Sequence, residues 1–326
     1  LLCSAYPTDR MSRLATGSSN GRATAAEQRG VSALIPALLG RLQSRDLIFI
    51  AEDEPAALEL THALEGGAPD QLVLFCPGSD ALPGDSAPPS AANVGQRATA
   101  LRRLRAELVS TERRMIALVT TGEAAARMYP PPAEFDAAPP IVRQGQEIEL
   151  EAFAEELAQI GYAPDDRVDE PGELAVRGQV IDVYPADAGG PFRIEVQEGR
   201  VTSIHSYDPA SQLTNGECET LELGRVSEPE LIDPVPLLDH LPGAAVAFQN
   251  GADKRRRRFL ALAADATRRR PGRAARDVCP QERWDAALAE RELLDLAAEA
   301  GGPVPRFVES RSPVRAFKKA ALEAME

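Results

Sequence analysis

The sequence predicts a mixed α/β protein with a parallel sheet in one part of the chain and a small antiparallel sheet in another. Up to about residue 130, fully apolar runs alternate with stretches of helical periodicity, which is typical of parallel strands covered on both faces. From Gly161 onward the pattern changes to short strands of period two, separated by glycine turns. Beyond Arg225, a proline-rich stretch precedes another apolar strand and two helices.

The first part of the chain predicts a repeated helix and strand pattern. Leu34, Leu38, Leu39 and Leu42 recur at helical spacing and precede a short apolar run. The expected helices cover residues 31–42, 56–64 and 97–108, and the expected strands cover residues 47–50, 72–75 and 115–120. Pro130–Pro132 is expected to end this part as a stiff linker.

The remaining elements are also placed by periodicity and by turn residues. We expect a helix over 147–160, strands over 173–176, 179–184, 192–198 and 201–207, a second linker up to Pro236, a strand over 244–248, a basic helix over 254–270 and a helix over 284–300. The Ser/Gly/Asn/Arg-rich residues 1–29 are expected to form a flexible leader.

Composition and charge exclude several classes of protein. The 326 residues carry a net charge of -14, which argues against a protein that coats nucleic acid or anionic membrane with its whole surface. Four scattered cysteines and three scattered histidines give no metal-binding spacing, so we expect no metal site. No apolar run is long enough to span a bilayer, and we expect a cytoplasmic protein without a membrane partner.

The sequence also gives no support for nucleotide binding or hydrolysis. No glycine-rich turn is followed by the lysine and serine or threonine that hold phosphates and magnesium. The acidic run Glu52–Glu54 follows an apolar strand, but without that lysine it is best interpreted as a solvated turn that caps the next helix. We therefore expect neither catalytic activity nor a cofactor.

The segment 251–276 holds ten Lys/Arg and two Asp, so a helix there could bind phosphates or an acidic partner. The simpler interpretation, which we favour, is a helix with a buried stripe of Phe259, Leu260 and Leu262 and a solvated basic face. The residues of the alternative nucleic-acid patch are Lys254, Arg255, Arg256, Arg258 and Arg268.

Residues 161–214 are the most informative stretch. Gly178 permits a positive φ in the turn between two strands, and Arg177 stands beside it. A partner's carboxylate or backbone carbonyl is one possible acceptor for this arginine. Spacing alone favours an internal partner instead, for which Glu173, Asp182 and Asp208 are the candidates.

The same stretch closely resembles the N-terminal UvrB-like module of the bacterial transcription-repair coupling factor (Mfd). Ala175-Val176-Arg177-Gly178 follows the family's A-x-RG motif, and Tyr184-Pro185 stands where the family has Phe-Pro. The similarity extends upstream through Phe75-Cys76-Pro77 and downstream through Leu237–Pro242, and it weakens in the last hundred residues. The family's arginine after Gly-Tyr is Ala163 here.

The resemblance implies a fold and a partner. Residues 30–130 and 226–326 would be the two halves of a degenerate RecA-like α/β domain, and residues 131–225 an inserted α+β domain that docks on the excision-repair protein UvrA. Arg177 would be the charged anchor, Tyr184 an apolar contact beside it, and Asp182 an internal partner that orients Arg177.

The function expected on this basis is a non-catalytic interaction module in nucleotide excision repair coupled to transcription. Two alternative functions belong to other functional classes. One is a DNA-binding protein that uses the basic helix 254–270, and the other is a fragment of an ATP-dependent helicase or translocase.

Overall fold

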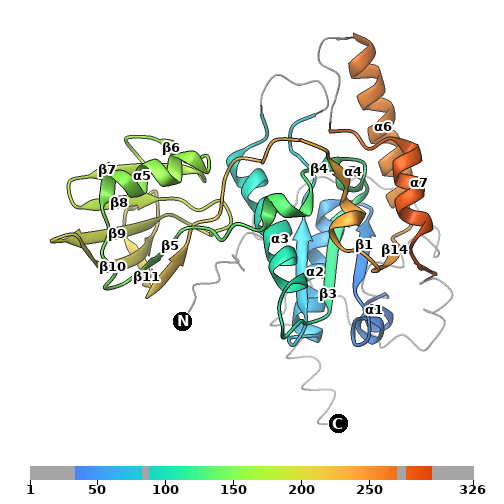
Figure 1. Ribbon diagram of the computed structural model, residues 1–326, viewed down its shortest axis with the longest axis horizontal. Helices are drawn as coiled ribbons and strands as arrows, with labels where there is room; N and C mark the ends of the chain where they lie inside the picture. The colour runs from blue at the N-terminus through green and yellow to red at the C-terminus, as the bar shows by residue number, and fades with distance from the viewer. Residues whose placement is uncertain (1–33, 83–87, 270–276, 296–326) are drawn as a thin grey trace, which may run out of the picture.

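The computed structural model describes residues 34–82, 88–269 and 277–295 (Figure 1). The expected leader, residues 1–29, lies outside the described residues. Within the described ranges the chain forms a mixed α/β structure with two principal sheets, one of five parallel strands and one of six strands. We call the five-stranded sheet with its packed helices the parallel unit. We call the six-stranded sheet with its packed helix the antiparallel unit.

The parallel unit is built on the strand order β15-β14-β1-β3-β2. Its strands are β1 (Leu47–Ala51), β2 (Leu72–Cys76), β3 (Ile116–Thr121), β14 (Ala245–Phe248) and β15 (Leu293–Leu294), and every neighbouring pair is parallel. The three strands β1, β2 and β3 are buried along their whole length, which explains why they appear in the sequence as unbroken apolar runs.

Helices cover both faces of this sheet. Helices α1 (Ile35–Leu42) and α2 (Glu54–Gly67) pack on the face that carries Phe49 and Val119. The opposite face carries Ile48 and Leu118, and it packs against α3 (Ala91–Leu108), α7 (Gln281–Ala289) and the short 3-10 helices η2 (Pro132–Phe135) and η3 (Leu237–His240). Side chains alternate along a strand, so β1, β2, β3 and β14 each supply both hydrophobic cores.

The antiparallel unit has the strand order β11-β10-β9-β8-β7-β6. Its strands are β6 (Ala163–Pro164), β7 (Glu173–Arg177), β8 (Val180–Val183), β9 (Phe192–Gln197), β10 (Arg200–Tyr207) and β11 (Thr214–Glu217). All neighbours are antiparallel except β6 and β7, which run parallel. Helix α5 (Leu150–Gln159) closes one face of the sheet over a core that includes Phe153, Leu157 and Ile181.

Shorter elements complete the description. Strand β5 (Ile141–Arg143) pairs with β12 (Thr220–Glu222), and β4 (Met128–Tyr129) pairs with β13 (Val235–Pro236). The one-turn helix α4 (Gly122–Ala125) follows β3 and contacts the basic helix α6 (Ala252–Arg269).

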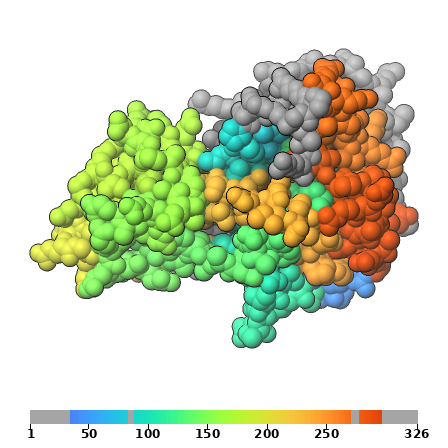
Figure 2. All heavy atoms as spheres, turned by 45° about the horizontal axis from the view of Figure 1, so that its top comes forward, coloured from blue at the N-terminus to red at the C-terminus, as the bar shows by residue number. Residues whose placement is uncertain are grey.

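The two units meet along α3, which lies on the side of the parallel unit that faces the antiparallel unit (Figure 1). At Gly95 of α3, an added Cβ would lie 2.1 Å from the Cβ of Ala186 in the antiparallel unit. The buried Arg97 of α3 donates from Nε to Glu228 at 2.6 Å and from Nη1 to Asn93 at 2.7 Å. Close packing at Gly95 therefore joins the two units, which Figure 2 shows side by side, and Arg97 links α3 to the segment between β12 and β13.

Three local expectations were wrong. The helix expected over residues 284–300 ends at Ala289, because the chain turns there and Leu293–Leu294 pairs with β14. The proline run at 130–132 does not end the parallel unit as a stiff linker, since η2 begins at Pro132 and buries Phe135 in the core of that unit. The helix expected from Arg97 begins earlier, at Ala91, where the Ser90 side chain caps it.

Candidate protein-binding surface

The side chains predicted for partner binding lie on one face of the antiparallel sheet. Ala175 pairs with Asp182 across β7 and β8, and Arg177 pairs with Val180. Because side chains alternate along a strand, Ala175, Arg177 and Asp182 share one face, whereas Leu174 and Val176 point to the other. We call the face that carries Arg177 and Asp182 the arginine face.

Asp182 is the charged centre of the arginine face. Its side chain is 4% exposed, and its two oxygens accept from Nε and Nη2 of Arg193 at 2.7 and 2.9 Å. These hydrogen bonds raise the pKa of Arg193, whose guanidinium also lies 4.9 Å from the ring centre of Tyr207. A bidentate pair of this kind fixes both side chains.

Arg177 is held more loosely. Its Nη1 lies 3.7 Å from Oδ2 of Asp182, and its side chain is 52% exposed. The other internal partners considered from spacing are engaged elsewhere: Glu173 accepts from the backbone N–H of Asp169, and Asp208 accepts from that of Ser211. Arg177 is thus an oriented guanidinium that faces solvent, above a carboxylate that is already paired.

Tyr184 lies under the surface rather than on it. Its side chain packs with Val168 and Ala175 and is only 9% exposed. Val168 belongs to the loop that follows β6, and its backbone carbonyl accepts from the hydroxyl of Tyr207 at 3.4 Å. Burial raises the pKa of Tyr207 to about 12, so this hydroxyl stays protonated and donates.

A depression of about 370 Å³ opens on the arginine face. We call it the arginine pocket; its lining residues are Asp166, Arg167, Val168, Arg177, Asp182, Tyr207, Ala210 and Gln212. Sequence reasoning missed Arg167 and Arg193. The alternation in Phe192–Val196 could have placed Arg193 on this face, but no periodic signal exists for Arg167, which lies in a loop.

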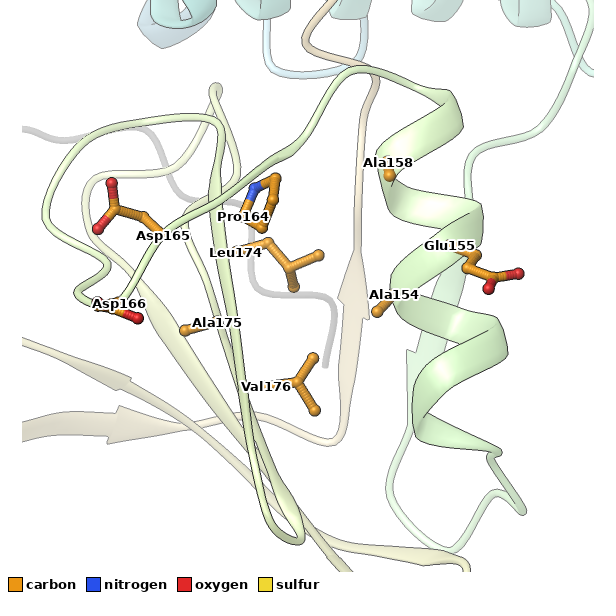
Figure 3. Close-up of a pocket in the computed structure, with 9 residues that line it drawn as sticks. All are labelled: Ala154, Glu155, Ala158, Pro164, Asp165, Asp166, Leu174, Ala175 and Val176. Atoms are coloured by element: carbon orange, nitrogen blue, oxygen red, sulfur yellow. The ribbon is translucent and has the colours of Figure 1, made fainter.

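The opposite face of β7 borders a wider groove of about 720 Å³. Figure 3 shows Ala154 and Ala158 of α5 turned toward Leu174 and Val176 of β7. Val176 is 41% exposed there, so neighbouring residues of β7 present an apolar side chain to one face and a charged one to the other.

Only part of the predicted nucleic-acid patch on the basic helix α6 is exposed. Lys254, Arg255, Arg258 and Arg268 are exposed, as expected for a solvated face. Arg256 differs from the prediction, because its side chain is only 2% exposed. Its guanidinium lies 4.7 Å from the ring centre of Trp284 and donates to Asp253 at 3.1 Å. A buried arginine that is paired within the protein is not available to a phosphate.

Neighbouring carboxylates engage much of the remaining charge on α6. Arg255 lies 3.4 Å from Glu123 and 3.9 Å from Asp53, and Arg268 lies 3.5 Å from Asp265. The apolar stripe also differs from expectation, because Leu262 is 54% exposed while Phe259 and Ala263 are buried.

The acidic turn after β1 is a helix cap. Oδ1 of Asp53 accepts from the backbone N–H of Ala56 at 3.0 Å, which confirms the capping interpretation. Partial loss of hydration, followed by the charges of Asp80 and Glu123, raises the pKa of Glu54. The carboxyl end of β1 is therefore rich in carboxylates.

Two further observations concern only the part of the chain that the structure describes. It contains no cluster of three or more His, Cys, Asp or Glu side chains arranged to hold a metal ion. None of the helices in residues 34–82, 88–269 and 277–295 has the length and apolar composition needed to cross a bilayer.

Comparison with known proteins confirms the resemblance read from the motifs. Residues 141–227, which include the whole antiparallel sheet, match the family model of the UvrB interaction domain. The chain is similar to transcription-repair-coupling factors, with 27% identity over 185 residues to that of Bacillus subtilis (strain 168) and 32% over 193 residues to that of Myxococcus xanthus. The protein from Escherichia coli (strain K12) is 28% identical over 177 residues.

These matches cover a larger share of this chain than of its relatives. The alignments with the Bacillus and Myxococcus proteins each include 57% of this chain, and the Escherichia alignment includes 54%. They span only 15%, 16% and 15% of those three relatives in the same order.

Proposed function

We propose that this protein is a docking module for a UvrA-type excision-repair protein, acting in nucleotide excision repair coupled to transcription. One observation carries the proposal: within the stretch that matches the UvrB interaction domain, Arg177 stands half-exposed above a carboxylate that Arg193 already pairs. An arginine whose donors are largely free, in a fixed place on a folded sheet, is suited to bind a partner's carboxylate or carbonyl.

Each predicted site residue takes a distinct part in this proposal. Arg177 is the charged anchor that contacts the partner. Asp182 is a positioning residue, because it lies within ion-pair distance of Arg177 while it holds Arg193. Tyr184 supports the surface from beneath by packing against the loop residue Val168, since little of its ring reaches solvent.

We also propose the finer architecture implied by the resemblance. Residues 30–130 and 226–326 would form a degenerate RecA-like domain, and residues 131–225 would be inserted between its halves. The sheet order supports this, because β14 and β15 join the sheet begun by β1, β2 and β3. A non-catalytic role is supported by the match of residues 141–227 to the UvrB interaction domain, because such a domain binds a protein partner.

Hydrogen exchange followed by mass spectrometry tests the proposed surface. Adding UvrA from the same host should slow exchange in residues 163–184, because docking excludes water from the β7–β8 hairpin and the loop after β6. Exchange in α6 should not change. Protection confined to α6, or none anywhere in the chain, would contradict the proposal.

The DNA-binding alternative rests on the exposed face of α6. Lys254 and Arg258 are exposed there, and neither makes an ion pair within the described residues. This alternative predicts DNA affinity that falls steeply with salt and is lost when both side chains are replaced by Gln. Unchanged DNA affinity in that variant would exclude α6 as the binding element.

A further inference from the structure

Two exposed guanidiniums line the arginine pocket, although only one of them belongs to a motif recognised in the sequence. Arg177 reaches the pocket from β7, and Arg167 reaches it from the loop that follows β6. Their side chains are 52% and 60% exposed. The pocket thus brings together two cations that are ten positions apart in the chain.

The loop holds Arg167 in a defined place. Its backbone N–H donates to Oδ1 of Asp165 at 3.1 Å, and its Nη2 donates to the carbonyl of Pro209 at 2.9 Å. The next residue, Val168, is buried under the loop at 2% exposure. A long side chain that is already oriented loses less conformational freedom on binding than a free one.

The charges around the pocket leave room for an incoming anion. Asp182 at its base is committed to Arg193 and reaches Arg177 only at 3.7 Å. Asp169 lies 3.2 Å from Nε of Arg167. A guanidinium has five N–H donors, so both arginines retain unused donors. The lining of the pocket contains one further carboxylate, that of Asp166.

We propose that Arg167 is a second docking anchor, and that the arginine pocket binds an Asp or Glu side chain of the partner between Arg167 and Arg177. This inference rests on the proposed function and specifies the chemistry that the docking surface recognises. Two guanidiniums that converge on one carboxylate select an acidic side chain over a neutral one of the same shape.

The test is a double-mutant cycle on binding to the host's UvrA, measured by calorimetry with Arg167→Gln, Arg177→Gln and the double variant. Each single variant should weaken binding by roughly 10- to 100-fold. The double variant should lose less than the product of the two single losses, because both side chains hold the same carboxylate. Arg167→Lys should fall between Arg167→Gln and the original protein, since it keeps the charge but not the planar fork.

Arg200→Gln is the matched control. Arg200 is also about half-exposed, at 56%, but it pairs with Glu147 and does not line the pocket, so its replacement should leave affinity unchanged. Thermal melting of every variant shows whether it is folded.

The two proposals fail in different ways. Normal binding by a folded Arg167→Gln variant would overturn the second anchor and leave the proposed function standing. Absence of binding by the unaltered protein would overturn both. Losses that simply multiply in the double variant would exclude a shared carboxylate.

Discussion

The two units use arginine in opposite ways. In the parallel unit, Arg97 and Arg256 are 3% and 2% exposed, and they join segments that are far apart in the sequence. In the antiparallel unit, Arg177 and Arg167 stand more than half exposed beside carboxylates that hold them in place. A buried, fully engaged arginine maintains the architecture, whereas an oriented arginine with unused donors is suited to recognition.

The largest expected effect is a loss of stability on acidification, caused by a buried histidine of the parallel unit. His240 of the parallel unit is buried against the rings of Tyr129 and Phe135, and burial lowers its pKa to about 4 from an ordinary 6.5. Between these values the unfolded chain binds the proton and the folded protein does not, so stability falls as the pH drops from about 7 to 4. The loss should reach about 3 kcal/mol.

Urea unfolding at several pH values checks this prediction. His240→Leu should remove most of the dependence between pH 4 and 7, while His62→Gln, which changes an exposed histidine, should keep it. An unaltered pH dependence in His240→Leu would mean that other groups control the acid response.

The next largest effect on stability is expected from removing a buried arginine of the parallel unit. Arg256→Ala loses the stacking on Trp284 and the hydrogen bonds to Asp253 and Gln281, which should lower the free energy of unfolding by about 2 to 3 kcal/mol. Arg257→Ala is the matched control, because Arg257 is 75% exposed and its replacement should cost less than about 0.5 kcal/mol. Equal effects in chemical denaturation would contradict the assignment of Arg256.

The contact between the units can be tested with the same substitution in two helices. Gly95→Ala should destabilise the protein by about 1 to 3 kcal/mol, since the new Cβ would lie 2.1 Å from the Cβ of Ala186. Gly40→Ala in α1 should stabilise it by about 0.5 to 1 kcal/mol, because nothing lies within 4 Å of its Cβ. Thermal unfolding should therefore show shifts of opposite sign, and shifts of the same sign would exclude tight packing at Gly95.

The smallest effect is expected on the apolar side of β7. Val176 adjoins Arg177 in sequence but lines the groove on the opposite face (Figure 3), so Val176→Ser should change affinity for UvrA by less than about twofold. A loss of tenfold or more in a binding titration would move the docking surface from the arginine face to that groove.

Sequence patterns located most of the fold because each unit has its own period. The apolar runs at 47–50 and 115–120 became β1 and β3, and the alternating stretches at 173–176 and 192–198 became β7 and β9. Errors arose where packing overrides local pattern. Leu293 and Leu294 look helical in sequence, but they complete the edge of the parallel sheet beside β14.

The candidate site was only partly predictable. The turn at Gly178 and the period of the strands place Arg177 and Asp182 on one face, and both can be deduced from spacing. The burial of Tyr184 and the position of Arg167 depend on how one irregular loop folds over the sheet. No residue pattern encodes that, and Arg167 supplies a cation in a chain that has Ala163 where the resemblance implies an arginine.

The most direct test of the central claim is calorimetric titration of the host's UvrA with the unaltered protein and with Arg177→Ala, at moderate and at high salt. We predict binding at micromolar concentration or tighter, weakened by high salt and reduced by roughly 10- to 100-fold in the folded variant. Equal affinity of the two proteins, or no binding by either, would contradict the assignment of the arginine face as the docking surface.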